Sequence, residues 1–185
     1  VKRAVLLGDP GSGKSTTLAA AIEWMNGTMA RHVVTIEDPI EYLFVGRSCL
    51  FTQREVGIDT PTFAEGLRRS LRQNPDVIFV GEIRDALTAA TAIQASETGH
   101  LVLATLHASS CADAVERLQF QFPHEEREAI RKTLSAQLLG VLCQRLLSGA
   151  GGGVTLASEY FTNFGATRKL IAEDKLPELT DLIAR

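Results

Sequence analysis

The sequence predicts an α/β protein in which a parallel β-sheet is covered by helices. Two observations lead to this fold class. A short apolar run at residues 3–8 stops at a glycine-rich loop, and strand-like and helical segments then alternate along the chain. The run DVIFV at residues 76–80 is continuously apolar over the length of one strand, which is typical of a parallel strand buried on both faces. Alternating strands and helices favour a parallel sheet with helices on both of its sides.

The individual elements follow from local signals. We expect strands at residues 3–8, 32–37, 76–80, 101–106 and 154–161. We expect helices at residues 14–25, 60–73, 85–98, 110–120 and 123–147, followed by two short helices in the tail. Thr60 with Pro61 behind it predicts one helix start, and Asp85 predicts another. In the longest helix an apolar stripe recurs at helical spacing: Ile130, Leu134, Leu138, Val141 and Leu142. We assign residues 1–148 to the core and residues 149–185 to a strand and helices that complete the same domain.

Composition narrows the class of protein. The 185 residues carry 19 basic against 22 acidic side chains, a net charge of -3, which argues against a general nucleic-acid binder. No apolar run approaches the roughly 20 residues that cross a bilayer, so we expect a cytoplasmic protein that does not span a membrane. Cys49, Cys111 and Cys143 form no CxxC pair, which favours reduced thiols over a zinc site or disulfides. Because a strand follows Val1 almost at once, we expect an N-terminal partner domain outside this chain.

The strongest motif is the run GDPGSGKS at residues 8–15, which matches the phosphate-loop pattern GxxxxGK[ST]. It lies between a strand and a helix, where backbone N–H groups and the helix N-terminus favour a bound phosphate. Lys14 is expected to reach the β- and γ-phosphates, and the Ser15 hydroxyl to ligate Mg²⁺. The predicted ligands are therefore ATP and Mg²⁺. The predicted binding residues are Gly8, Asp9, Pro10, Gly11, Ser12, Gly13, Lys14, Ser15 and Thr16.

Acidic residues end two of the predicted strands. Glu82 follows the strand at 76–80, where a Walker B carboxylate is expected, although Gly81 stands where an aspartate is usual. Glu37 and Asp38 end the strand at 32–37. Together the two clusters predict one carboxylate for Mg²⁺, assigned to Glu82 and acting through water, and one general base. For either acid taken alone, a surface or capping role is an equal alternative.

The histidines and arginines indicate a particular function less clearly than the phosphate loop and the acidic residues do. His107 follows the strand at 101–106, where it is placed to sense the γ-phosphate, whereas His100 precedes that strand and is structural or at an interface. Five arginines lie on one helix or near the acids: Arg54, Arg68, Arg69, Arg72 and Arg84. They form either a solvated face or contacts to phosphate or a neighbouring subunit, and the sequence does not divide these alternatives.

Taken in order, the motifs resemble the secretion-type ATPases of type II secretion and type IV pili. After the phosphate loop come TIEDPIEY at 35–42, QREVG at 53–57, LRQNPD at 71–76, VGEIRD at 80–85 and the histidine-containing runs at 98–107. The resemblance is strong over residues 4–148 and looser over the remainder. The absence of a four-cysteine insertion and the run ATRKLI at 166–171 place the chain nearest the pilus retraction ATPases. Two departures are Ala108, where threonine is usual, and Thr167, where the retraction pattern has isoleucine.

This resemblance implies a RecA-like fold, a homo-oligomer in the form of a hexameric ring, and Mg-ATP hydrolysis. It implies mechanical work on an inner-membrane platform protein, in pilus retraction (twitching motility) or related secretion, at the cytoplasmic face of that membrane. In the family the acid at the position of Glu37 is the candidate base and that of Glu82 serves the magnesium water shell. The arginine fingers lie in the separate N-terminal domain.

Three alternatives stay open. The chain could be a nucleotide-dependent assembly module with negligible turnover, although the presence of both Glu37 and Glu82 favours an enzyme. It could be a conjugation or Dot-type secretion ATPase, which shares much of the motif set. A small-molecule kinase would need an acceptor pocket and a lid, and the sequence indicates neither.

Overall fold

The computed structural model describes residues 5–8, 11–148 and 152–183. The chain divides into two compact units, which we describe separately. The first unit contains residues 15–105. The second contains residues 4–14, which include most of the phosphate loop, and residues 106–185.

The first unit is built on four parallel strands in the order β3-β2-β4-β5. Their bounds are β2 (His32–Glu37), β3 (Leu50–Glu55), β4 (Val77–Val80) and β5 (Leu101–Leu106). All four residues of β4 are buried, as are the last five of β2 and of β5. The continuous apolar runs of the sequence therefore correspond to strands covered on both faces, as predicted. Strand β3 was not predicted, because as the edge strand it carries the mixed run LFTQRE.

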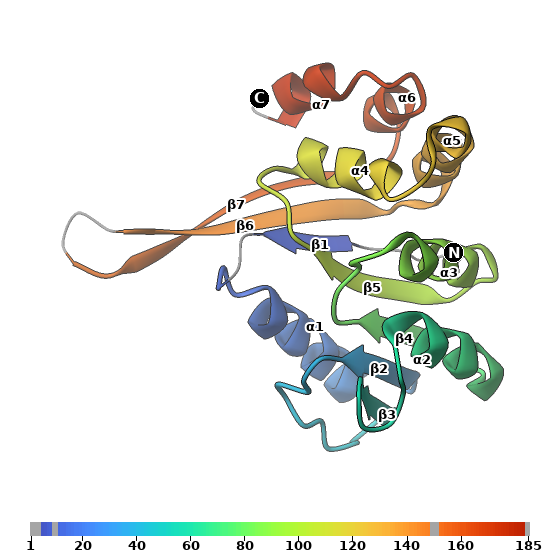
Figure 1. Ribbon diagram of the computed structural model, residues 1–185. Helices are drawn as coiled ribbons and strands as arrows, with labels where there is room; N and C mark the ends of the chain where they lie inside the picture. Colours follow the sequence, from blue (N-terminus) through green and yellow to red (C-terminus); the bar gives the residue numbers. More distant parts are fainter. Residues whose placement is uncertain (1–4, 9–10, 149–151, 184–185) are drawn as a thin grey trace. The chain divides into compact units, whose positions relative to one another are not determined.

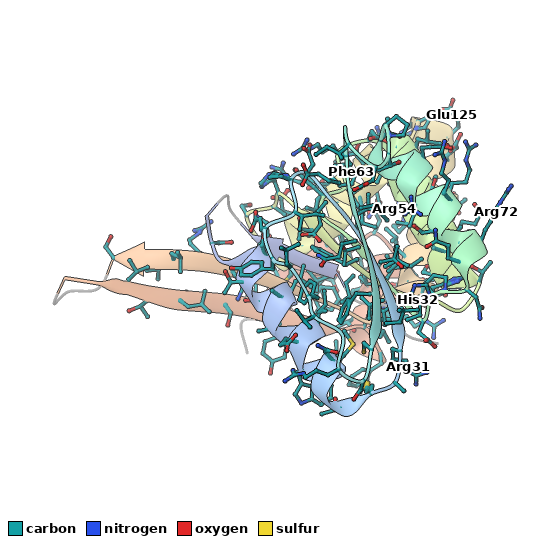
Figure 2. All side chains as sticks on the ribbon, turned by 90° about the horizontal axis from the view of Figure 1, so that it is seen from below. Arg31, His32, Arg54, Phe63, Arg72 and Glu125 are labelled. Atoms are coloured by element: carbon teal, nitrogen blue, oxygen red, sulfur yellow. The ribbon has the colours of Figure 1, made fainter. Side chains whose placement is uncertain are left out.

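Helices cover both faces of these strands. Helix α1 (Lys14–Thr28) lies on one side of β2, and α2 (Phe63–Ser70) lies on the other (Figures 1 and 2). A 3-10 turn, η1 (Leu71–Gln73), extends α2, and α3 (Ala86–Glu97) follows β4. Figure 2 shows Arg31 and His32 at the beginning of β2 and Phe63 toward the opposite end of the strands.

Of the two predicted helix N-caps, one is confirmed and the other is wrong. The side chain of Asp85 accepts the Thr88 amide at 2.8 Å, so it caps α3 as predicted. The prediction of Thr60 as the cap of α2 is wrong. Thr62 is the cap, its hydroxyl accepting the Glu65 amide at 3.1 Å, because Thr60 lies in the preceding turn and donates its hydroxyl proton to the Thr62 carbonyl.

The second unit combines three strands and a group of helices. Strand β1 (Val5–Gly8) pairs in parallel with β6 (Gly140–Ser148), which forms an antiparallel ribbon with β7 (Val154–Thr162). The helices are α4 (Cys111–Phe120), α5 (Arg127–Gln137), α6 (Ala166–Ala172) and α7 (Leu176–Ile183), with a 3-10 turn η2 (His124–Glu126) before α5. In Figure 1 these four helices lie on one side of the ribbon. Val115, Ile171 and Leu179 are fully buried in their core.

The predicted helix over 123–147 is wrong beyond Gln137. Leu138 is extended, and β6 begins at Gly140, where an added Cβ would lie 2.6 Å from the Phe161 carbonyl oxygen. Asn163 closes the end of α5 by donating to the carbonyls of Ser135 and Leu138, both at 2.9 Å. The spacing of the apolar residues fits a helix and a strand equally well in this stretch, and the partner strand β7 decides between them.

Candidate functional site

The phosphate loop has the backbone that its glycines allow. Gly11 (φ 73°) and Gly13 (φ 88°) are in the left-handed region, which favours glycine because it has no Cβ. Gly8 ends β1, whereas Asp9 and Pro10 lie outside the described residues. The hydroxyl of Ser12 is buried, with the residue only 2% exposed, and has no hydrogen-bond partner in the described part of the chain. A buried hydroxyl of this kind fits a loop that closes around a phosphate oxygen.

The loop runs directly into α1, so Lys14, Ser15 and Thr16 occupy the first turn of a helix. A helix N-terminus presents unpaired N–H groups and a partial positive charge, which suits an anion. The Thr16 hydroxyl lies 3.0 Å from the Tyr42 hydroxyl. This contact joins the first turn of α1 to the loop that follows β2.

That loop is anchored to α1 at a second place. Asn26, which is fully buried in α1, donates to the Val45 carbonyl at 2.9 Å and accepts the Arg47 amide at 2.8 Å. Arg47 also forms an ion pair with Glu23 of α1. The loop after β2 is thus held along the length of the helix.

Glu37 is the last residue of β2 and is only 6% exposed. Burial raises the pKa of its carboxyl group, because the charged form loses hydration, and the hydrogen bond from Gln53 opposes part of that rise. Gln53 Nε2 lies 3.4 Å from Glu37 Oε1 and 2.8 Å from the Tyr42 carbonyl oxygen. Gln53 Oε1 accepts the Phe44 amide at 2.9 Å. A carboxylate whose pKa is moved toward neutrality is suited to general-base chemistry.

Gln53 and Tyr42 were not among the predicted site residues. Parallel pairing of β2 and β3 sets Thr35 opposite Gln53, which brings the Gln53 side chain to Glu37. The signal that would have found Gln53 is a strand at residues 50–55, and this edge strand lacks the apolar run by which strands are detected.

Gly81 separates β4 from Glu82 and has a steric reason to be glycine. A Cβ at this position would lie 3.1 Å from the Ile36 carbonyl oxygen and 3.2 Å from the Glu37 Cα. The Gly81 amide donates to the same Ile36 oxygen at 2.7 Å, and the Thr105 hydroxyl donates to the Gly81 carbonyl. The Cβ of the aspartate usual at this position would make these same tight contacts with β2, and the first acid after β4 is Glu82.

Glu82 is paired with an arginine. Arg84 Nε donates to Glu82 Oε2 at 2.6 Å, and Arg84 Nη1 donates to Asp38 Oδ2 at 3.0 Å. The two acids raise the pKa of the Arg84 guanidinium, with Glu82 contributing most. The first unit therefore brings together the first turn of α1, the loop after β2 and the loop after β4.

The described residues contain no group of three or more His, Cys, Asp or Glu side chains that could hold a metal ion unaided. Mg²⁺ in nucleotide sites does not need such a cage, since it keeps several waters and takes one or two protein ligands beside the phosphates. Ser15, in the first turn of α1, and Glu82, after β4, carry oxygen atoms of the kind that Mg²⁺ takes as ligands. When bound, Mg²⁺ would neutralise phosphate charge.

The two histidines are separated by the length of β5. His100 precedes the strand, and its Nδ1 lies 2.9 Å from the Ala95 carbonyl oxygen and 3.1 Å from the Thr98 hydroxyl. It lines a cavity of about 340 Å³ at the amino ends of β4 and β5, together with Arg31 and Asp76. His107 follows β5, is exposed and belongs to the second unit.

Three of the five arginines are exposed on α2 or η1: Arg68, Arg69 and Arg72. Arg68 and Arg69 both form ion pairs with Glu65 on α2. Arg72 is exposed, and Figure 2 shows its side chain directed away from the ribbon. Arg54 lies on the edge strand β3 with its Nε buried.

The fold and the loop define a protein of the P-loop nucleotide-binding class. A model of the family described as "Type II/IV secretion system protein" matches residues 3–153, and the chain belongs to this family.

Two curated relatives and two solved structures illustrate the match. The chain is 46% identical to the type IV pilus retraction ATPase PilT of Pseudomonas aeruginosa, over 97% of this chain and 52% of that protein. It is 43% identical to a twitching motility protein of Neisseria gonorrhoeae, over 97% of this chain and 48% of that protein. The crystal structure of the pilus retraction motor PilT with bound ADP superposes with a TM-score of 0.93 at 48% identity, covering 98% of this chain and 53% of that one. The ATPase DotB of Legionella pneumophila has a TM-score of 0.91 at 32% identity, covering 100% and 53%.

The chain spans about half the length of the curated relatives it matches. Within the described ranges no helix is both long and apolar enough to cross a membrane.

Proposed function

We propose that this chain is the motor domain of an ATPase that hydrolyses Mg-ATP to drive type IV pilus retraction or a related secretion process. The observation that carries the proposal is the set of groups joined in the first unit. Hydrogen bonds through Tyr42 and Gln53 link the first turn of α1 to the buried Glu37. Arg84 links Glu82 to Asp38, the residue after Glu37. A relative named as a pilus retraction ATPase and a solved structure named as the VirB11 ATPase of a type IV secretion system support the same function.

Each group has a proposed role. The loop and Lys14 bind the β- and γ-phosphates, and Ser15 with Glu82 serves the magnesium ion. Glu37 is the general base that accepts a proton from the attacking water, since its pKa is raised by burial. His107, which follows β5, is proposed to respond to the γ-phosphate. We further propose a hexameric ring that works on an inner-membrane platform protein from the cytoplasmic side.

The test is multiple-turnover phosphate release from Mg-ATP with no added acceptor. Release from the parent supports an ATPase over a kinase, which needs an acceptor, and over an assembly module with negligible turnover. Glu37→Gln should retain nucleotide binding and lower turnover by roughly 10²–10⁴, the usual contribution of a positioned general base. Equal turnover in this variant and the parent would remove Glu37 from the mechanism.

A further inference from the structure

Arg84 is held by groups from three different segments of the first unit. Its Nε donates to Glu82 Oε2 at 2.6 Å, and its Nη1 donates to Asp38 Oδ2 at 3.0 Å. Its guanidinium carbon lies 5.8 Å from the centre of the Phe63 ring, at the start of α2. Glu82 follows β4 and Asp38 follows β2, and these two strands are neighbours in the sheet. One side chain therefore spans the ends of two adjacent strands.

The planar fork of arginine is suited to this position. A guanidinium directs several N–H donors at fixed angles, so it can bind two carboxylates at once and set the angle between them. Arg84 is 54% exposed, and ion pairs this exposed contribute little to folding stability. Glu82, by contrast, has only 16% of its side chain exposed. The ion pair between Arg84 and Glu82 therefore orients the Glu82 carboxylate and adds little to the stability of the fold.

We propose that Arg84 is a positioning residue for Mg-nucleotide binding: it fixes the orientation of Glu82 and, through Asp38, connects that carboxylate to the loop that follows Glu37. This inference rests on the proposed function, because Glu82 is assigned there to the magnesium ion. It adds that the magnesium carboxylate and the base are not independent. Their strand ends are connected by one guanidinium, so displacing Arg84 alters both.

The same pair of strands offers a matched control at its other end. Arg31 Nη1 donates to Asp76 Oδ1 at 3.1 Å, joining the residue before β2 to the residue before β4. This pair is similarly exposed, at 41% and 42%. Neither residue has a proposed role in nucleotide binding, so Arg31 variants report what the loss of such an ion pair does by itself.

The experiment measures binding of a non-hydrolysable ATP analogue to the 185-residue chain over a series of Mg²⁺ concentrations. The variants are Arg84→Ala, Arg84→Lys, Arg31→Ala and Arg31→Lys. Outer partners of metal ligands typically contribute 10- to 100-fold to metal affinity, and Arg84 orients one such partner, the water-linked Glu82 carboxylate, so both Arg84 variants should raise the half-saturating Mg²⁺ by up to about that factor. Lysine keeps the charge but not the fork, so it should not rescue. Both Arg31 variants should match the parent. Circular dichroism checks that each variant is folded. Because Arg84 holds the loop after β2 through Asp38, amide hydrogen exchange in residues 38–44 should become faster in the Arg84 variants and in no other variant.

The remaining outcomes separate the two claims. Analogue binding by the parent with an unchanged Mg²⁺ requirement in both Arg84 variants would overturn the inference and leave the proposed function standing. If Arg84→Lys had the Mg²⁺ requirement of the parent and Arg84→Ala a higher one, the effect would come from the positive charge alone. That result would also overturn the proposal that Arg84 orients Glu82. An equal rise of the half-saturating Mg²⁺ in the Arg31 variants would also overturn the inference, because it would show that the loss of any such ion pair has this effect. No Mg-dependent binding by the parent would overturn the proposed function, and the inference with it.

Discussion

Gln53 Nε2 lies 3.4 Å from the carboxylate of Glu37 and 2.8 Å from the carbonyl oxygen of Tyr42. One amide group therefore connects the proposed base to the loop that follows it. Since Tyr42 also contacts Thr16 at 3.0 Å, the connection continues to the first turn of α1.

Replacing this amide should disturb the base more than the fold. Gln53→Leu keeps most of the side-chain volume but removes the donor to Glu37 and the acceptor for the Phe44 amide. The hydrogen bond from Gln53 lowers the pKa of Glu37, so its loss should raise that pKa further. The acidic limb of the pH–turnover profile should then move to higher pH. Gln94→Leu, on the exposed face of α3, is the control, and an unmoved profile in Gln53→Leu would show that the amide does not act on Glu37.

Glu37→Gln should make the folded chain more stable at pH 8. Burial raises the pKa of Glu37 above its ordinary 4.5, so the folded state holds this proton more tightly than the unfolded state does. The free energy of unfolding therefore falls as pH rises from about 4.5 through the raised pKa. Glutamine carries no charge and removes this cost. Urea unfolding at several pH values should show a gain at pH 8 that shrinks as pH approaches 4.5.

Glu128→Gln is the control for this experiment and has the opposite expected sign. Its ion pair with Lys132 lowers the pKa of the Glu128 carboxyl, so that interaction is present at pH 8 and is lost in acid. If Glu37→Gln were no more stable than the parent at pH 8, burial of the charged Glu37 would not lower the free energy of unfolding, and the prediction would be wrong.

Gly81→Ala should weaken the fold at the ends of β2 and β4. The new methyl group would lie 3.1 Å from the Ile36 carbonyl oxygen, and backbone atoms cannot move aside as a flexible side chain can. Overpacking of this kind costs about 1–3 kcal/mol, measurable as a lower urea midpoint. Gly27→Ala is the matched control. Its Cβ would meet only Arg47 at 3.7 Å, and alanine favours the helix, so that variant should be at least as stable as the parent. Similar midpoints for the two variants would contradict the close approach at Gly81.

Lys14→Ala should abolish stabilisation by Mg-ATP, because the loop loses the cation expected to contact the phosphates. A ligand at 100 times its dissociation constant adds about 2.7 kcal/mol to stability, which a thermal melt detects. Lys132→Ala, which removes an exposed ion pair on α5, should leave the ligand-induced shift unchanged. If Lys14→Ala were stabilised as much as the parent, the assignment of the loop would be wrong.

Several of these features could be predicted from local sequence. The phosphate loop depends on glycines and a lysine at fixed spacing, and β4 on one continuous apolar run, so neither needs information from distant residues. The cap at Asp85 is similarly local, since its bond closes within three residues.

The remaining features depend on pairing between distant segments. The contact between Gln53 and Glu37 follows from the register of β3 on β2, and the requirement for glycine at residue 81 follows from the approach of β2 to β4. The antiparallel partner of residues 140–148 lies in β7, which the spacing of apolar residues in that stretch alone does not reveal.

Burial of all three cysteines has a practical consequence. Cys49, Cys111 and Cys143 are free thiols that are at most 7% exposed, and burial raises the pKa of the Cys111 thiol above its ordinary value. Structural thiols that are buried react slowly with maleimides. Arg72→Cys and Glu125→Cys, both at exposed positions labelled in Figure 2, would therefore accept fluorescent dyes selectively in the otherwise natural sequence. A donor and an acceptor at these two sites, one in each unit, would test by energy transfer whether nucleotide binding changes the distance between the units.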